Sequence, residues 1–367
     1  MFTRADDKIT SSQAAVILTN TVLGAGVLTM PRSVTQAVKT PDAWITVLLG
    51  GAVIMLVIWL MVKLCQQFPG QTIFQFSGTI IGNIPGKLLC VPLIVYFVII
   101  AGFEIRSVAE VTLFFLLEGT PVWAVVLPFI WAGAYLVWGG INSIARVFQI
   151  VLPISLLVLL ISYGVSLRLF DVDNLRPVLG QGLPPVLHGL KSSILVYSGC
   201  EVVLTTTAFL EQPRRAVKAM LGGITIPLVL YLMTAVFVIG GLSIDSVITS
   251  TWPTIDLVRS FEITGFFVER LEFPLMVIWL MQMFCNFSSF FFQAALGASQ
   301  VCGFSFKTAV FALVPVIFLS TMIPKSIQDL FALGDAIGMM SIGLFFLLPV
   351  PLLIIWLIRT KGGKRHV

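Results

Sequence analysis

The stretch that decides the fold is residues 19–31, TNTVLGAGVLTMP, which places polar side chains, two glycines and a proline inside a long apolar run. Glycine and proline both weaken a helix. A helix broken at membrane depth releases backbone groups that lipid cannot satisfy, so the break must line a cavity or a ligand site. The half-helix after Gly26 would offer N–H groups and its positive dipole end to an anion. The alternative is that Gly24 and Gly26 only permit close helix packing.

A second stretch of the same kind lies about 175 residues further along, where residues 195–201, LVYSGCE, precede three threonines at 205–207. A charged side chain near mid-membrane costs roughly 2.5–3.5 kcal/mol on insertion scales, so Glu201 must be protonated, paired or hydrated. Two roles stay open for Glu201: capping of backbone groups that the break releases, or ligand contact and proton coupling. The match between the two stretches favours paired helix breaks over simple packing.

The composition excludes a soluble globular protein. Of 367 residues, 58% are apolar and 11% are Asp, Glu, Lys or Arg, against roughly 25% charged residues in a soluble domain. A crossing helix needs about 20 apolar residues, and an open strand edge cannot be satisfied in lipid. We therefore expect an all-α integral membrane protein with ten transmembrane helices. The ten apolar runs fall at about 13–37, 43–65, 86–117, 121–139, 146–167, 186–210, 217–241, 270–302, 307–323 and 333–358.

The transmembrane region divides into two similar halves. We expect an N-terminal segment at 1–12, a single transmembrane domain at 13–358 and a basic tail at 359–367. Repeat one, at about 13–167, and repeat two, at about 186–358, each begin with a glycine-interrupted span and have an unusually long third span. Each half has five spans, an odd number, so the second half enters the membrane from the opposite face and the repeat is inverted.

Basic residues predict the orientation. The main clusters, Arg4/Lys8, residues 214–218 and residues 359–365, are separated by even numbers of spans and so share one side. With the other loops counted, 13 Lys and Arg lie on that side and eight on the other. The positive-inside rule then places both termini in the cytoplasm. The net charge of +5 reflects this orientation and does not indicate a nucleic-acid partner.

Further polar residues fall inside the third and eighth spans. Arg106 and Glu110 are four residues apart and can pair on one helix face, whereas Glu104 points elsewhere and needs another partner. Such residues face a bundle interior and form either a structural ion pair or part of a polar or ion path. One or two turns earlier, Tyr96 and Ile100 can wall a central pocket. In the eighth span, Asn286 is either a pocket contact or an interhelical hydrogen-bonding residue.

Motifs for enzymatic chemistry are absent from the sequence. The two histidines, His188 and His366, form neither a metal cluster nor a Ser/His/Asp set. The five cysteines have no CxxC spacing. We expect no catalytic residues, no metal and no cofactor.

At these residues the chain resembles the amino acid/polyamine/organocation (APC) transporter superfamily. Leu23 to Gly26 resembles its first-helix signature, and Tyr197 to Glu201 its sixth-helix signature. Over nearly the full length the chain is more closely similar to the spore germination permease family, the B subunits of nutrient germinant receptors. The supporting stretches are Gly24 to Arg32, Asp42 to Trp44, Phe68 to Gly70, Gly139 to Arg146, Asn174 to Pro177, Trp252 to Thr254 and Phe266 to Glu272.

The resemblance implies a LeuT-type fold of five-plus-five inverted repeats with broken first and sixth helices and a mid-membrane pocket between spans one, three, six and eight. It also implies the inner membrane of bacterial spores, a receptor A subunit, a lipoprotein C subunit and a small germinant, most often an L-amino acid. The ligand-binding candidates are Leu23, Gly24, Ala25, Gly26, Tyr96, Ile100, Tyr197, Ser198, Gly199, Cys200 and Asn286. The candidates for an intramembrane polar or ion path are Glu104, Arg106, Glu110 and Glu201.

Three functions fit these features. The first hypothesis is a germinant-sensing subunit in which ligand binding at the broken helices shifts a two-state bundle. The second is a secondary amino acid transporter of the APC superfamily. The third is a scaffold that anchors its partners and binds no solute. Ligand binding separates the scaffold from the other two, and concentrative uptake separates the transporter from the sensor.

Overall fold

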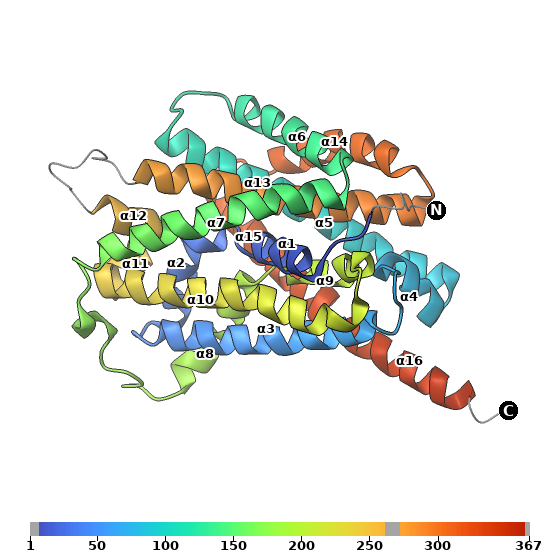
Figure 1. Ribbon diagram of the computed structural model, residues 1–367. Coiled ribbons are helices and arrows are strands. Elements are labelled where there is room, and N and C mark those ends of the chain that lie inside the picture. Colours follow the sequence, from blue (N-terminus) through green and yellow to red (C-terminus); the bar gives the residue numbers. More distant parts are fainter. Residues whose placement is uncertain (1–6, 261–271, 364–367) are drawn as a thin grey trace.

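The computed structural model describes residues 7–260 and 272–363, which form a bundle of helices (Figure 1). A parallel bridge between Ile9 and Leu210 is the one β-type pairing among these residues. The helices are α1 (Ser11–Val22), α2 (Gly26–Val38), α3 (Ala43–Cys65), α4 (Ile73–Ile81), α5 (Asn83–Phe115), α6 (Val122–Trp138), α7 (Ile141–Ser166), α8 (Pro184–Val196), α9 (Val203–Thr206), α10 (Ala216–Leu242), α11 (Ile244–Thr249), α12 (Pro253–Arg259), α13 (Glu272–Cys302), α14 (Phe306–Met322), α15 (Ile327–Ser341) and α16 (Pro349–Gly363). Short 3-10 segments lie at Val172–Leu175, Cys200–Val202, Thr207–Phe209 and Pro213–Arg215, and a π-helical segment, Ile342–Leu347, lies between α15 and α16.

The long apolar helices confirm an integral membrane protein. Six helical stretches of the described chain are long and apolar enough to cross a bilayer, and two bent helix pairs raise the number to eight. The remaining candidates, α6 and α14, are apolar helices of 17 residues each. The total of ten crossings therefore stays a prediction, as do the repeat and segment boundaries.

Both expected helix breaks are present. α1 ends at Val22 and α2 begins at Gly26, with their axes bent by 56°. α8 ends at Val196 and the chain resumes helical structure at Cys200 after a bend of 54°. Gly199 has φ +109°, a conformation that favours glycine. A Cβ on Gly199 would overlap the carbonyl oxygen of Thr21, so the backbones of the two breaks lie directly against each other.

The first half of the first broken span, α1, lies among long helices, whereas α8 lies at the edge of the bundle. α1 packs against α7, α10 and α13, while α5 packs against α13, α14 and α15 (Figure 1). α13 is the most buried long helix, with 78% of its most apolar window inside the bundle. The last span, residues 327–359, has 19% of the corresponding window buried and lies at the edge of the bundle. α16 extends away from the other helices in Figure 1.

Three short helices occur where the sequence analysis expected only connections. α4, α11 and α12 have nine, six and seven residues, too short to produce a membrane-length apolar run. α4 begins at a capping box of Thr72 and Gln75, a local signal that hydropathy does not register. The last span begins at 327 and not at 333, because Ser326 caps α15 through the amide of Asp329.

Backbone contacts place two parts of the expected basic face side by side. The amide of Ile9 donates to the carbonyl of Phe209 at 2.8 Å, and the amide of Glu211 donates to the carbonyl of Ile9 at 3.1 Å. These bonds put the start of α1 beside the end of the sixth span, as an even number of crossings requires. The cytoplasmic location of this face stays a prediction. Arg4, Lys364, Arg365 and residues 266–271 lie outside the described residues.

A substitution at Gly199 tests whether the two breaks must touch. Gly199→Ala places a Cβ against the Thr21 carbonyl and puts a side chain in a left-handed conformation, which alone costs roughly 1–2 kcal/mol. We expect a loss of at least about 2 kcal/mol in the free energy of unfolding, measured by denaturant titration in lipid nanodiscs. Gly222→Ala, at an open position of α10, is the matched control and should leave stability unchanged or slightly higher. An equal loss in the free energy of unfolding in both variants would contradict direct packing of the second helix break against the first.

Candidate functional site

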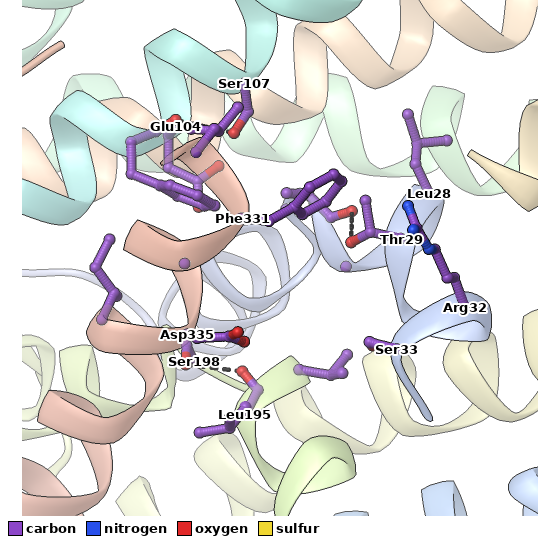
Figure 2. A pocket seen from close by; sticks show the side chains of 18 of the residues that line it. Leu28, Thr29, Arg32, Ser33, Glu104, Ser107, Leu195, Ser198, Phe331 and Asp335 are labelled. Carbon is purple, nitrogen blue, oxygen red and sulfur yellow. Dashed lines mark hydrogen bonds between the residues drawn. The ribbon is translucent and has the colours of Figure 1, made fainter. Parts of the chain in front are cut away.

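A cavity of about 370 Å³ lies between α2, α5, α8, α13 and α15 (Figure 2). Its inner wall contains Gly24 and the buried Asn286, and it extends outward to the exposed Ser33 and Gln36 of α2. Its volume falls in the range of small-molecule sites, roughly 300–1,000 Å³. The cavity is therefore large enough for a small solute and reaches from the first helix break to the end of the bundle that carries α12.

The carbonyl side of the first break is satisfied by side chains from distant helices. Gln282 Nε2 donates to the Asn20 carbonyl at 2.9 Å and Asn286 Nδ2 to the Thr21 carbonyl at 2.8 Å. The Tyr231 hydroxyl donates to the Val22 carbonyl at 2.7 Å. These three oxygens are the groups released when α1 stops, so the protein itself caps them and they are not left for a ligand.

The amide side of the same break faces the cavity. Gly24, Ala25 and Gly26 line it, and α2 begins at Gly26. A helix leaves its first N–H groups without intrahelical partners, and its dipole is positive at that end. The start of α2 can therefore bind an anionic group such as a carboxylate.

The second break is closed by its own glutamate. Glu201 is fully buried; one carboxylate oxygen accepts a hydrogen bond from the Tyr96 hydroxyl, and the other accepts from the Gly199 amide at 2.8 Å. Tyr197 is also buried, and its hydroxyl donates to the Val47 carbonyl at 3.2 Å. The carboxylate of Glu201 therefore accepts the hydrogen bond of the Gly199 amide, so this amide is not available to a ligand. Of the two roles open for Glu201, these contacts favour capping.

The charged residues of α5 separate into a pair and a single carboxylate. Arg106 Nη2 lies 2.7 Å from Glu110 Oε1, and Arg106 Nε donates to the same oxygen at 2.8 Å, which is the ion pair expected from their spacing. Glu104 is 5% exposed and lines the cavity, and its Oε2 has no hydrogen-bond partner in the described part of the chain. Glu104 Oε1 lies next to Gly24, 3.5 Å from the position of a Cβ there.

The structure brings about half of the expected site residues to the cavity. Those that line it are Gly24, Ala25, Gly26, Ile100, Ser198, Asn286, Glu104 and Glu110. Those that lie outside its lining are Leu23, Tyr96, Tyr197, Gly199, Cys200, Arg106 and Glu201. The ligand-binding and ion-path roles of all fifteen stay predictions. In the described residues no group of three or more His, Cys, Asp or Glu side chains could hold a metal ion.

Sequence reasoning missed several residues of the cavity wall. Arg32 and Phe331 face each other there, with the guanidinium 5.5 Å from the ring centre, and Asp335 lies across the cavity from α2 near Ser198 (Figure 2). The sequence does mark Asp335 as a candidate site residue, because it is the one charged residue in the apolar run 333–358. A single intramembrane acid of this kind is a functional candidate. Arg32 lies in the more polar last part of the run 13–37 and carries no comparable signal.

Two helix breaks that meet beside a central cavity are features of the LeuT fold, and comparison with solved structures supports this fold. The structure of MhsT in complex with L-phenylalanine superposes with a TM-score of 0.64 at 13% sequence identity, over 94% of this chain and 97% of that one. The sequence profile described as spore germination protein matches residues 8–330. The chain belongs to this spore germination permease family.

Two Bacillus subtilis relatives cover almost the whole chain. Spore germination protein YndE is 42% identical over 357 residues, which are 97% of this chain and 98% of YndE. Spore germination protein A2 is 35% identical over 358 residues, 96% of each chain. The chain therefore combines the spore germination protein family with a LeuT-type fold.

Replacing the carboxyl group of Glu201 by an amide tests the capping role. In Glu201→Gln one oxygen becomes an NH₂ group, which must face either the Gly199 amide or the Tyr96 hydroxyl, both donors in the native structure. We expect a loss of about 1–3 kcal/mol in the free energy of unfolding, the usual effect of a buried polar mismatch. Glu118→Gln removes the same charge from an exposed position and is the control. Unchanged stability of Glu201→Gln in nanodiscs would exclude a capping role.

Proposed function

We propose that this protein is the membrane-embedded, ligand-binding subunit of a nutrient germinant receptor, and that its cavity binds a small nutrient, an amino acid. The observation that carries the proposal is the uncapped start of α2, which opens onto a cavity of about 370 Å³ at a helix break. Membership of the spore germination permease family supports the germination role. In this proposal the protein lies in the inner membrane of the spore with both termini in the cytoplasm.

The proposed pose follows from the polar groups around the break. The ligand carboxylate meets the amides at Ala25 and Gly26, where the positive end of α2 favours an anion. The ligand side chain lies against the apolar wall formed by Ile100, Phe103 and Ile337. The capped carbonyls of the first break are not part of this pose, because α10 and α13 already donate to them.

Signalling requires that the ligand prefers one of two states of the bundle. A hundredfold preference corresponds to about 2.7 kcal/mol, which a few cavity hydrogen bonds supply. The ligand contacts α2, α5 and α15 at once, so a change in their spacing alters its affinity. The receptor A subunit and the lipoprotein C subunit would transmit that change.

A binding measurement on the purified protein in nanodiscs tests the pose. Gly26→Ala places a Cβ 2.9 Å from the Tyr231 hydroxyl and 3.0 Å from a Val196 methyl, which displaces the start of α2. We expect amino acid affinity, measured by calorimetry, to fall at least about tenfold, the effect of weakening one charge-assisted hydrogen bond. Gly222→Ala is the same change in open space and should bind as the wild type does. Equal affinity in the two variants would remove the α2 amides from recognition.

A secondary amino acid transporter is the second candidate, and the LeuT fold favours it. Both candidates use the same cavity, so binding alone does not separate them. Uptake of labelled amino acid into proteoliposomes under proton and sodium gradients does. Concentrative uptake by the isolated chain would favour the transporter, whereas binding without accumulation would favour the sensor.

A further inference from the structure

The cavity wall carries three charged side chains without an ion-pair partner among the described residues. They are Glu104 on α5, Asp335 on α15 and Arg32 on α2. The other charged residue in the lining, Glu110, is neutralised by Arg106. Arg32 lies on the far side of Phe331 from the inner wall, with its guanidinium against that ring (Figure 2). Apart from the Arg106–Glu110 pair, the lining therefore holds two acidic side chains and one basic side chain, and the basic one lies away from Glu104.

The inner wall is rich in acceptors that lack donors. Glu104 Oε2 and Asn286 Oδ1 are both buried and have no hydrogen-bond partner in the described structure. Asn286 is held in this orientation because its Nδ2 donates to the Thr21 carbonyl. A buried carboxylate without a partner is costly. An ammonium group has three donors and no acceptor, so it complements this part of the wall.

A second acceptor site lies on a different helix. Asp335 is exposed within the cavity, next to Ser198, whose hydroxyl donates to its own helix at the Leu195 carbonyl (Figure 2). α15 is fixed beside α5 because Gly334 lies against the ring of Phe103. One molecule within the 370 Å³ cavity can therefore face Glu104 at one end and Asp335 at the other.

We infer that the cavity selects a cationic amino acid, with its α-ammonium on Glu104 and Asn286, its carboxylate at the start of α2 and its side-chain cation on Asp335. This inference rests on the proposed function and narrows its ligand class. A neutral side chain of the same length leaves Asp335 without a partner. A site built to bind a polar group discriminates against analogues that lack this group, by about 10⁴-fold or more in the strongest cases.

The test is calorimetry on the full chain in nanodiscs with L-lysine and its neutral analogue L-norleucine. We expect lysine to bind at least about 100-fold more tightly than norleucine. Asp335→Asn should reduce that preference to about tenfold or less while norleucine affinity stays the same. Glu104→Gln should weaken lysine and norleucine equally, since both carry the α-ammonium. Asp245→Asn and Glu118→Gln remove the same charges at exposed positions outside the cavity and are the controls.

The outcomes separate this inference from the proposed function. Binding of norleucine as tight as that of lysine, or an unchanged lysine preference in Asp335→Asn, overturns the cationic ligand class and leaves the amino acid site standing. If Glu104→Gln binds lysine and norleucine as tightly as the wild type does, the Glu104 carboxyl is protonated and binds no cation. That result overturns the placement of the α-ammonium on Glu104. Absence of binding by lysine, norleucine and the other common amino acids overturns both. The exposed position of Asp335 keeps its variant informative should Glu104→Gln fold poorly.

Discussion

Lipid offers no hydrogen-bond partner, so every main-chain group released by the two helix breaks must be met from inside the protein or open onto a cavity. The first break is capped by side-chain donors and the second by a side-chain acceptor. At the first break, donors from Tyr231, Gln282 and Asn286 cap the carbonyls at the end of α1. At the second, the acceptor Glu201 caps the amide of Gly199. What stays uncapped is the amide end of α2, and the cavity lies there.

The two breaks also contact each other directly. Gly199 has no side chain, so its backbone lies against the Thr21 carbonyl, and the same carbonyl accepts a hydrogen bond from Asn286. The glycine, the carbonyl and the amide side chain come from three spans and hold one another in place. A rigid junction of this kind gives the start of α2 a defined direction, which an anion-binding helix end requires.

The positions of the breaks could be predicted from sequence because their causes are local. Glycine and hydroxyl residues within an apolar run mark residues 19–31 and 195–201 without any knowledge of the fold, and Pro31 adds to the first signal. The capping partners could not be predicted, because Tyr231 and Gln282 lie 209 and 262 residues away from the carbonyls they bind. The role of Glu201 depends in the same way on a distant residue, because Tyr96, which donates to its carboxylate, lies 105 residues away.

The sequence of a single span predicts contacts between its own charged residues but not contacts between charged residues of different spans. The spacing of Arg106 and Glu110 was enough to predict their pair, since both lie on one helix face. Glu104 and Asp335 belong to different halves of the chain, and only the packing of α15 against α5 places them on one cavity.

That packing also joins helices of unequal burial. α5 packs against the most buried helix, α13, whereas α15 belongs to the least buried span and continues into the π-helical segment Ile342–Leu347. π-helical segments are frequent at functional sites. A ligand that contacts both walls links the core of the bundle to its edge, and its affinity then depends on their separation. A bound solute can bias two states of the bundle only through such a difference.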